Sequence, residues 1–280
     1  MAYIPWSAIF LAIPTTFVPG LRRLGFVLLL WGYLTAFYIG QLDRFAVDSL
    51  VGLLLCGYAI TQSKAYVRCA GHLLFVLLAF GLSLHWLPGF HNVKALGPIR
   101  FTPDAVPFTM YLNLDKPLIG VWVLAVVPWL RLSTSFWKTI LAALGGLMAT
   151  ALVCLGAALI LGTVAWAPKL PASSGIWLIN NLLLVTFAEE ALFRGYLQGG
   201  LQRLLQGWRW QSAIAIGTTA ILFGASHAAG GWQWMALGTL AGIGYGITYR
   251  FGGLSAAIAA HFGLNVLHFF LFTYPMLQPG

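Results

Sequence analysis

Charged residues, and acidic residues above all, are scarce in this chain. Only six of its 280 residues are Asp or Glu and 8% are charged, whereas 60% are hydrophobic. So little polar material cannot cover the surface of a water-soluble globule. The composition therefore excludes the soluble classes and predicts a multi-pass integral membrane protein whose surroundings are the lipid bilayer.

A basic stripe is absent as well, although the formal net charge is +9. The 15 Lys and Arg stand singly or in pairs at the ends of apolar runs, which is the pattern of membrane flanks and excludes a nucleic-acid partner. If every apolar run crosses the bilayer, nine basic residues fall on one side and five on the other, which predicts that both termini lie outside.

Cysteine motifs and a signal peptide are missing too. Cys56, Cys69 and Cys154 lie in apolar segments without CxxC or Cys/His spacing, which gives no sign of a redox or zinc centre. The N-terminal 20 residues lack a basic n-region, so we expect them to remain as a first span. A compact chain without an organelle signal favours a bacterial inner (plasma) membrane.

Long apolar runs dominate what is present. They show continuous apolarity instead of alternation, which excludes a barrel and predicts an all-α, polytopic transmembrane helix bundle. Two runs are short enough to be re-entrant or interfacial, so we expect eight to ten spans. The runs are approximately 2–19, 24–41, 48–62, 67–87, 117–130, 138–164, 175–200, 212–228, 232–249 and 254–273.

Two parts of the chain differ in what they offer. Residues 1–135 carry no recognisable motif, and we interpret them as accessory transmembrane helices. They include a long loop near 88–116 that is either a lid or a plain connector. We interpret the segment 136–280, which contains the polar residues considered next, as a catalytic transmembrane core.

The only two glutamates of the chain, Glu189 and Glu190, lie in the apolar run 182–200 together with Arg194. Charge inside a span is costly and is rarely kept without a function. On a helix Glu190 and Arg194 share a face at i and i+4, whereas Glu189 points elsewhere. This spacing predicts that Arg194 neutralises Glu190 and that Glu189 serves as a general base. The alternative is an ion pair that only locks helix packing.

Further polar residues occur in later runs. His227 follows Phe223 by four residues, and His261 and Asn265 share a helix face, with His268 near the same stripe. Taken alone, each buried His is more often a packing contact than a catalyst. Together with the glutamates they supply a base, imidazoles and an amide donor, which is what water attack on a carbonyl requires.

The motifs EExxxR in "EEALFR", FxxxH in "FGASH" and HxxxN in "HFGLN" resemble, in this order, those of the CPBP family of intramembrane proteases. That family includes the CAAX prenyl endopeptidases and the bacteriocin-processing and immunity (ABI-like) proteins. The resemblance covers roughly residues 175–273 and implies an endopeptidase that cuts a membrane-associated or lipidated protein or peptide.

Residue roles follow from the same resemblance. It implies that Glu189 and His227 activate water and that His261 and Asn265 stabilise the oxyanion. Glu190 and Arg194 are expected to organise the site, with Phe223 as part of its motif.

The need for a metal and two rival functions stay open at this point. Two carboxylates and two imidazoles, those of Glu189, Glu190, His227 and His261, are able in principle to hold zinc. The absence of HExxH and the nearness of Arg194 favour a reaction without a metal cofactor. A non-catalytic immunity or scaffold protein and, less favoured, a proton-coupled transporter are the alternatives.

Overall fold

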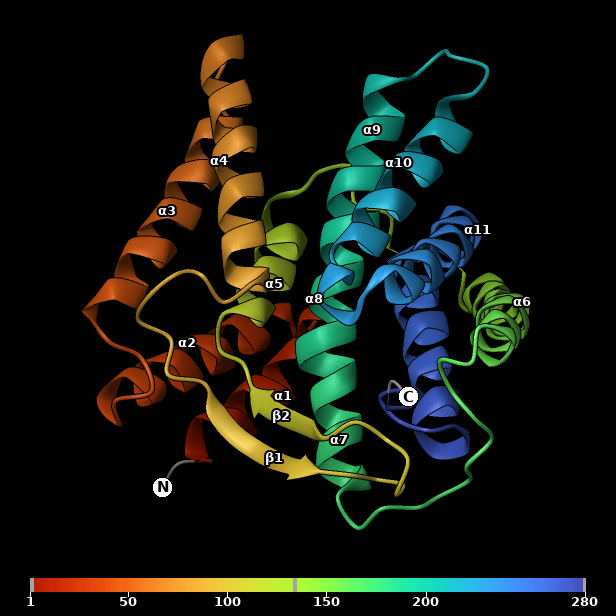
Figure 1. Ribbon diagram of the computed structural model, residues 1–280. Coiled ribbons are helices and arrows are strands. Elements are labelled where there is room, and N and C mark those ends of the chain that lie inside the picture. The colour runs from red at the N-terminus through yellow and green to blue at the C-terminus, as the bar shows by residue number, and fades with distance from the viewer. Residues whose placement is uncertain (1–2, 133–134, 279–280) are drawn as a thin grey trace. The chain divides into compact units, whose positions relative to one another are not determined.

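The computed structural model describes residues 3–132 and 135–278, which are mostly helical (Figure 1). The chain divides into two compact units. The first comprises residues 1–94, 111–126 and 183–188, and the second comprises 95–110, 127–182 and 189–280. The sequence placed a single boundary near residue 135, and that division into accessory and catalytic parts stays a prediction.

The helices of the first unit coincide with the first five apolar runs. Their bounds are α1 (Ile4–Phe17), α2 (Arg22–Tyr38), α3 (Arg44–Ile60), α4 (Ala65–Ser83) and α5 (Lys116–Val126). Helix α3 begins where the side chain of Asp43 accepts a hydrogen bond from the Phe45 amide at 2.8 Å, a typical N-cap. A buried Trp122 of α5 donates to the Leu53 carbonyl of α3 at 2.8 Å and stacks on Phe75 of α4.

The long loop predicted near 88–116 contains a two-stranded sheet. Its strands are β1 (Val93–Ile99) and β2 (Phe108–Leu112), which pair directly with each other. The all-α expectation therefore holds for the apolar runs but not for this loop. Tyr111 and the neighbouring β-branched and aromatic residues of β2 favour a strand. The strand is too short, however, for an alternating hydrophobic pattern to reveal it in the sequence.

The remaining apolar runs lie in the second unit, except for residues 183–188, which belong to the first. The elements are α6 (Phe136–Ile160), a long helix 174–204, α10 (Gln211–Ala225), a 3-10 turn (Ala228–Gly230) and α11 (Trp232–Leu271). The long helix changes type along its length: α7 (Ser174–Asn180), a π-helical stretch Asn181–Thr186, α8 (Phe187–Glu190), a second π-helical stretch Ala191–Gln198 and α9 (Gly199–Leu204). Such wide turns often occur at functional sites. Here they flank Glu189 and Glu190.

Helix α11 is interrupted at Gly253, whose φ of 74° and ψ of −170° are open essentially only to glycine. Arg131 accepts a hydrogen bond from the amide of Leu254 at 2.8 Å just after the break. The rings of Tyr245 and His261 are stacked 4.4 Å apart, so the two halves of α11 lie side by side. The prediction of two separate runs, 232–249 and 254–273, is confirmed in this form.

The second unit is packed closely where glycines face a neighbouring helix. A methyl group on Gly242 would lie 2.9 Å from the Ala220 Cα of α10, and one on Gly238 would lie 3.1 Å from the Gly224 Cα. The tandem GxxxG pattern of α11, which also includes Gly246, therefore lets α10 and α11 approach closely.

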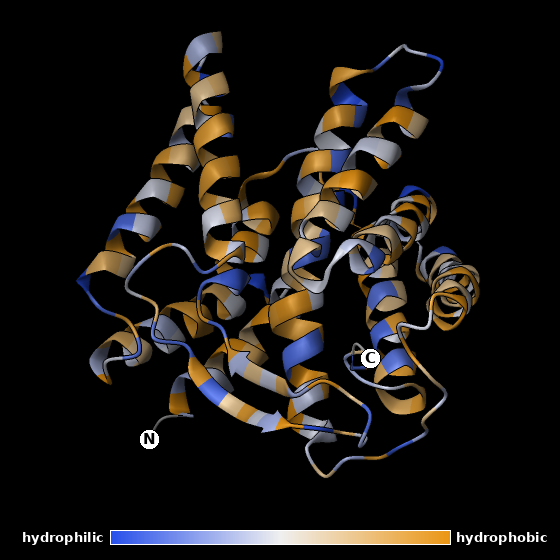
Figure 2. Ribbon diagram, viewed as in Figure 1, coloured by the Kyte–Doolittle hydropathy of each residue, from blue (hydrophilic) through white to orange (hydrophobic). Residues whose placement is uncertain are grey.

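Among the described residues, four helices are long and apolar enough to cross a membrane: Ala65–Ser83, Phe136–Ile160, Ser174–Leu204 and Trp232–Leu271. Helices α1, α5 and α10 are apolar but shorter. Figure 2 shows the helices largely in the colours of hydrophobic residues. The chain is thus a mostly helical membrane protein, while the expected number of eight to ten spans is not confirmed.

Replacement of Gly253 by Ala is expected to lower the free energy of unfolding by about 1 to 3 kcal/mol, because the Cβ is incompatible with this backbone conformation. Thermal unfolding in detergent measures the change. Gly217→Ala in α10 is the control, since its added methyl group meets no atom within 4 Å and favours the helix. Equal melting temperatures for both variants would contradict the assigned role of Gly253.

Candidate active site

The carboxylate of Glu190 lies at the centre of the polar residues of the second unit. Its side chain has no exposed surface, and Oε2 accepts a hydrogen bond from Nε of Arg194 at 3.1 Å. Oε1 accepts from Nδ1 of His261 at 2.9 Å. The predicted i, i+4 pair is confirmed, and Glu190 also links the helix 174–204 to the second half of α11.

Arg194 is fully buried among aromatic rings. Its guanidinium carbon lies 5.1 Å from the ring centre of Phe223, 5.8 Å from that of Tyr245 and 5.9 Å from that of Phe193. Its two terminal nitrogens have no hydrogen-bond partner among the described residues. Cation–π attraction is strongest when the charge is removed from water, so these rings replace part of the lost hydration.

His227 is held by the carbonyl of Phe223, the first residue of its own motif. The Nδ1 atom lies 2.8 Å from this oxygen. Because a carbonyl can only accept, Nδ1 carries the proton and Nε2 of the neutral ring is an acceptor. The rings of His227 and Phe223 are also in contact, 4.8 Å apart. His227 is therefore oriented so that Nε2 is able to take a proton.

His261 and Asn265 each have one polar group engaged by the protein. Nδ1 of His261 donates to Glu190, and its ring is edge-on to Phe223 at 5.6 Å. The Asn265 amide nitrogen donates to Oδ1 of Asn181 at 3.1 Å, so one of its two N–H bonds is used. The arrangement leaves Nε2 of His261 and the second N–H of Asn265 available to a ligand.

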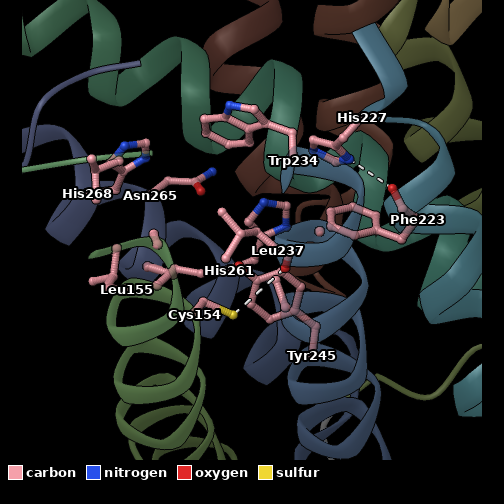
Figure 3. Close-up of a pocket in the computed structure, with 15 residues that line it drawn as sticks. Cys154, Leu155, Phe223, His227, Trp234, Leu237, Tyr245, His261, Asn265 and His268 are labelled. Atoms are coloured by element: carbon pink, nitrogen blue, oxygen red, sulfur yellow. Dashed lines mark hydrogen bonds between the residues drawn. The ribbon is translucent and has the colours of Figure 1, made fainter. Parts of the chain in front are cut away.

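These residues meet at a cavity of about 90 Å³. Figure 3 shows the side chains of Asn265 and His261 between those of His268 and His227. All four line the cavity, together with Phe223. The predicted residues of the FxxxH and HxxxN motifs are thus brought together.

The two glutamates and Arg194 are not among the residues that line the cavity. Glu190 and Arg194 lie behind it and reach it through His261 and Phe223. Glu189 is half-buried on the short helix α8. Its predicted role in water activation stays a prediction.

The remaining wall of the cavity is apolar. It is formed by Leu155 and Ala158 of α6, by Leu237 and Ala241 of α11 and by Val164. An apolar wall beside polar groups excludes bulk water and suits a hydrophobic segment of a ligand.

The C-terminal segment closes one rim of the cavity. The indole of Trp234, a lining residue, donates to Sδ of Met276 at 3.0 Å. The amide of Leu277 donates to the Thr163 carbonyl at 2.9 Å. Nζ of Lys169 donates to the Phe272 carbonyl, and burial lowers the pKa of this lysine to about 8.

Several of these residues were missed by the sequence reasoning. Tyr245, which stacks on His261, lies between Gly242 and Gly246 of the GxxxG pattern. That pattern was interpreted only as a close contact between helices. Asn181 was detectable as an amide inside an apolar run. His268 was noticed on the stripe of His261 without a role, and it lines the cavity while donating through Nε2 to the Thr273 carbonyl at 3.2 Å.

Glu190, one of the four residues considered for zinc, does not fit a metal site. Both of its oxygens already accept hydrogen bonds, from Arg194 and from His261. In the described part of the chain, no group of three His, Cys, Asp or Glu side chains is close enough to hold an ion. A tetrahedral site needs at least three such ligands.

Arg194→Gln is expected to cost about 3 to 5 kcal/mol of unfolding free energy, because it leaves the buried Glu190 carboxylate without its cation. The double variant Glu190→Gln/Arg194→Gln is expected to cost less, since no charge is stranded. Arg203→Gln, an exposed residue of the same helix, is the control and should be neutral. Denaturant unfolding in mixed micelles measures these three variants and Glu190→Gln alone. A double variant that costs as much as the two single changes combined would contradict the pairing.

Residues 171–267 match the family model described as Rce1-like, type II CAAX prenyl endopeptidase. The matched segment contains the EExxxR, FxxxH and HxxxN motifs. No curated protein and no solved structure matches the chain. The segment 171–267, which carries the residues of all three motifs and most of the cavity lining, is therefore similar to the Rce1-like family of CAAX proteases.

Proposed function

We propose that this protein is an intramembrane endopeptidase that hydrolyses a peptide bond of a membrane-associated or lipidated protein or peptide. The observation that carries the proposal is the cavity at which His227, His261 and Asn265 meet, with His261 held by the buried carboxylate of Glu190. The family match of residues 171–267 supports a protease role.

The first step is the activation of a water molecule. Nε2 of His227 takes one proton, assisted by the carboxylate of Glu189, and the water oxygen attacks the carbonyl carbon of the scissile peptide. This assignment uses the tautomer of His227 that the Phe223 carbonyl fixes. General-base assistance of this kind contributes roughly a hundredfold to ten-thousandfold.

The second step requires donors for the oxygen that becomes negative. Asn265 offers its remaining N–H, and His261 offers Nε2–H when its ring carries both protons. The C–N bond then breaks and the leaving amine receives the proton held by His227. The products are an amine and a carboxylic acid, which loses its proton to solvent. Glu190 and Arg194 act as positioning residues in this scheme, because they reach the cavity only through other side chains.

The apolar wall of the cavity indicates which kind of substrate the site accepts. The apolar wall of Leu155, Ala158 and Leu237 suits a substrate segment that lies in the membrane. A prenylated C-terminal CAAX sequence is one such substrate, and a bacterial membrane peptide is another. We further propose a bacterial inner membrane location, with eight to ten crossings in which the two halves of α11 count separately.

The strongest alternative is a non-catalytic immunity or scaffold protein on the same fold. A protein of this kind does not require Nε2 of His227 as a base, nor a carboxylate at residue 189. A proton-coupled transporter is less favoured, because the residues that line the cavity all belong to the second unit.

Glu189→Gln is expected to lower cleavage at least about a hundredfold without loss of protein from the membrane, because the amide is not a base. Mass spectrometry of peptide termini in membrane and secreted fractions, with wild type and variant compared, detects the loss and identifies the substrate. Asp48→Asn, an exposed carboxylate on α3, is the control. Identical terminus profiles for wild type and Glu189→Gln, beside an altered phenotype on deletion, would support the scaffold function instead.

Chelation is expected to leave the rate unchanged, because the described residues offer no three-ligand group. The measurement is cleavage of the identified substrate by purified protein before and after 1,10-phenanthroline, with metal content determined in parallel. Activity that is lost on chelation and restored by Zn²⁺ would contradict the metal-free mechanism while leaving the protease assignment intact.

A further inference from the structure

A second hollow, of about 290 Å³, lies in the second unit, separate from the catalytic cavity. It is bounded by α6 from Leu141 to Thr150 and by α11 from Gly244 to Phe251. In Figure 1 these two helices lie side by side. On α6 the hollow, here called the α6–α11 groove, extends over nine residue steps, or about 13 Å.

The groove is apolar and opens outward. Its rims are formed by Leu141 and Phe251, whose side chains are 69% and 68% exposed. Inside, a methyl group on Gly145 would meet no atom within 4 Å. The hydroxyl of Thr150 is buried at the inner end and has no hydrogen-bond partner among the described residues. Because α6 and α11 are both candidate spans, we expect the groove to face hydrocarbon.

One end of the groove carries exposed cations. Arg250 precedes the rim residue Phe251, and its guanidinium carbon lies 5.9 Å from the centre of that ring. Arg131 lies near the same end of the groove, because its carbonyl accepts a hydrogen bond from the Leu254 amide of α11 at 2.8 Å. Both arginine side chains are exposed.

A third cation belongs to the first turn of α6. The hydroxyl of Thr139 lies 3.5 Å from the Gly252 carbonyl of α11, so the neighbouring, exposed Lys138 lies at this end too. The segments 127–160 and 232–280 contain no Asp or Glu. The three cations therefore have no acidic counter-charge on their own elements, and the positive N-terminal end of α6 adds to their field.

We propose that the α6–α11 groove and these cations form a binding site for an anionic phospholipid. One acyl chain lies in the groove, and the phosphate group contacts Arg131, Lys138 and Arg250. Basic residues at the membrane surface attract anionic headgroups, and an apolar groove that leads away from them matches the shape of the same molecule. The site is independent of the proposed catalysis.

A peptide helix does not suit this groove. An α-helix with its side chains is about 10 to 12 Å across, so 13 Å of it occupies roughly 1,000 Å³. That exceeds the volume of the groove, whereas a single hydrocarbon chain is thin enough to enter.

The test uses purified protein in phosphatidylcholine vesicles that contain a trace of phosphatidylglycerol with a photoreactive acyl chain. A parallel sample contains the same photoreactive chain on phosphatidylcholine. After illumination, peptide mass spectrometry locates the label. We expect phosphatidylglycerol to label residues 141–150 and 244–251 in preference to phosphatidylcholine.

Two variants separate the parts of the site. Gly145→Leu should fill the groove and remove the label there, while Gly156→Leu, which also adds a side chain to α6 where no atom lies within 4 Å, should not. Lys138→Gln/Arg250→Gln should reduce the preference for phosphatidylglycerol about tenfold or more, while the exposed Arg209→Gln should not. Melting temperatures confirm that each variant is folded.

Three results would overturn the proposal. They are equal labelling by the two lipids, labelling that is unchanged in Gly145→Leu, and an undiminished preference in the double cation variant. Because the last variant changes only exposed side chains, the proposal remains testable if the groove-filling variant fails to fold.

Discussion

The site depends on the burial of one ion pair. Glu190 and Arg194 have no exposed surface, and a charge inside a span is expensive unless it is paired. The pair is stabilised by partners that also form the site: His261 binds the second oxygen of Glu190, and the Phe223 and Tyr245 rings lie near the guanidinium. Because His261, Phe223 and Tyr245 stabilise the buried pair, their contacts with it also hold them in place around the cavity.

Backbone features bring the partners of this pair within reach. The π-helical stretches on either side of α8 alter the register of the helix 174–204, which places Asn181 against Asn265 as well as Glu190 against His261. The break at Gly253 folds α11 back so that His261 stacks on Tyr245. Glycines at the α10–α11 contact bring His227 close to the same place, since a methyl group on Gly238 would lie 3.3 Å from its Nδ1. The polar residues alone would not form a site without these three features.

Sequence reasoning predicted those features that local pattern determines. Helix positions follow from the apolar runs, and the pairing of Glu190 with Arg194 follows from their spacing of four. The strands β1 and β2 were missed because their short segments have no clear period. The roles of Tyr245 and Asn181 were missed because they depend on which faces of distant segments meet, and a single sequence does not encode that in its spacing. Nor does the sequence reveal that π-helical turns flank α8.

The most direct test of the central claim is a double-mutant cycle on the cleavage rate with Glu190→Gln, His261→Gln and the combined variant. If Glu190 acts through His261, as the 2.9 Å hydrogen bond indicates, the combined variant should be no slower than the more damaging single variant. If the two losses multiply, Glu190 contributes to the reaction independently of His261, and the account of the buried ion pair as the support of the catalytic histidine is wrong.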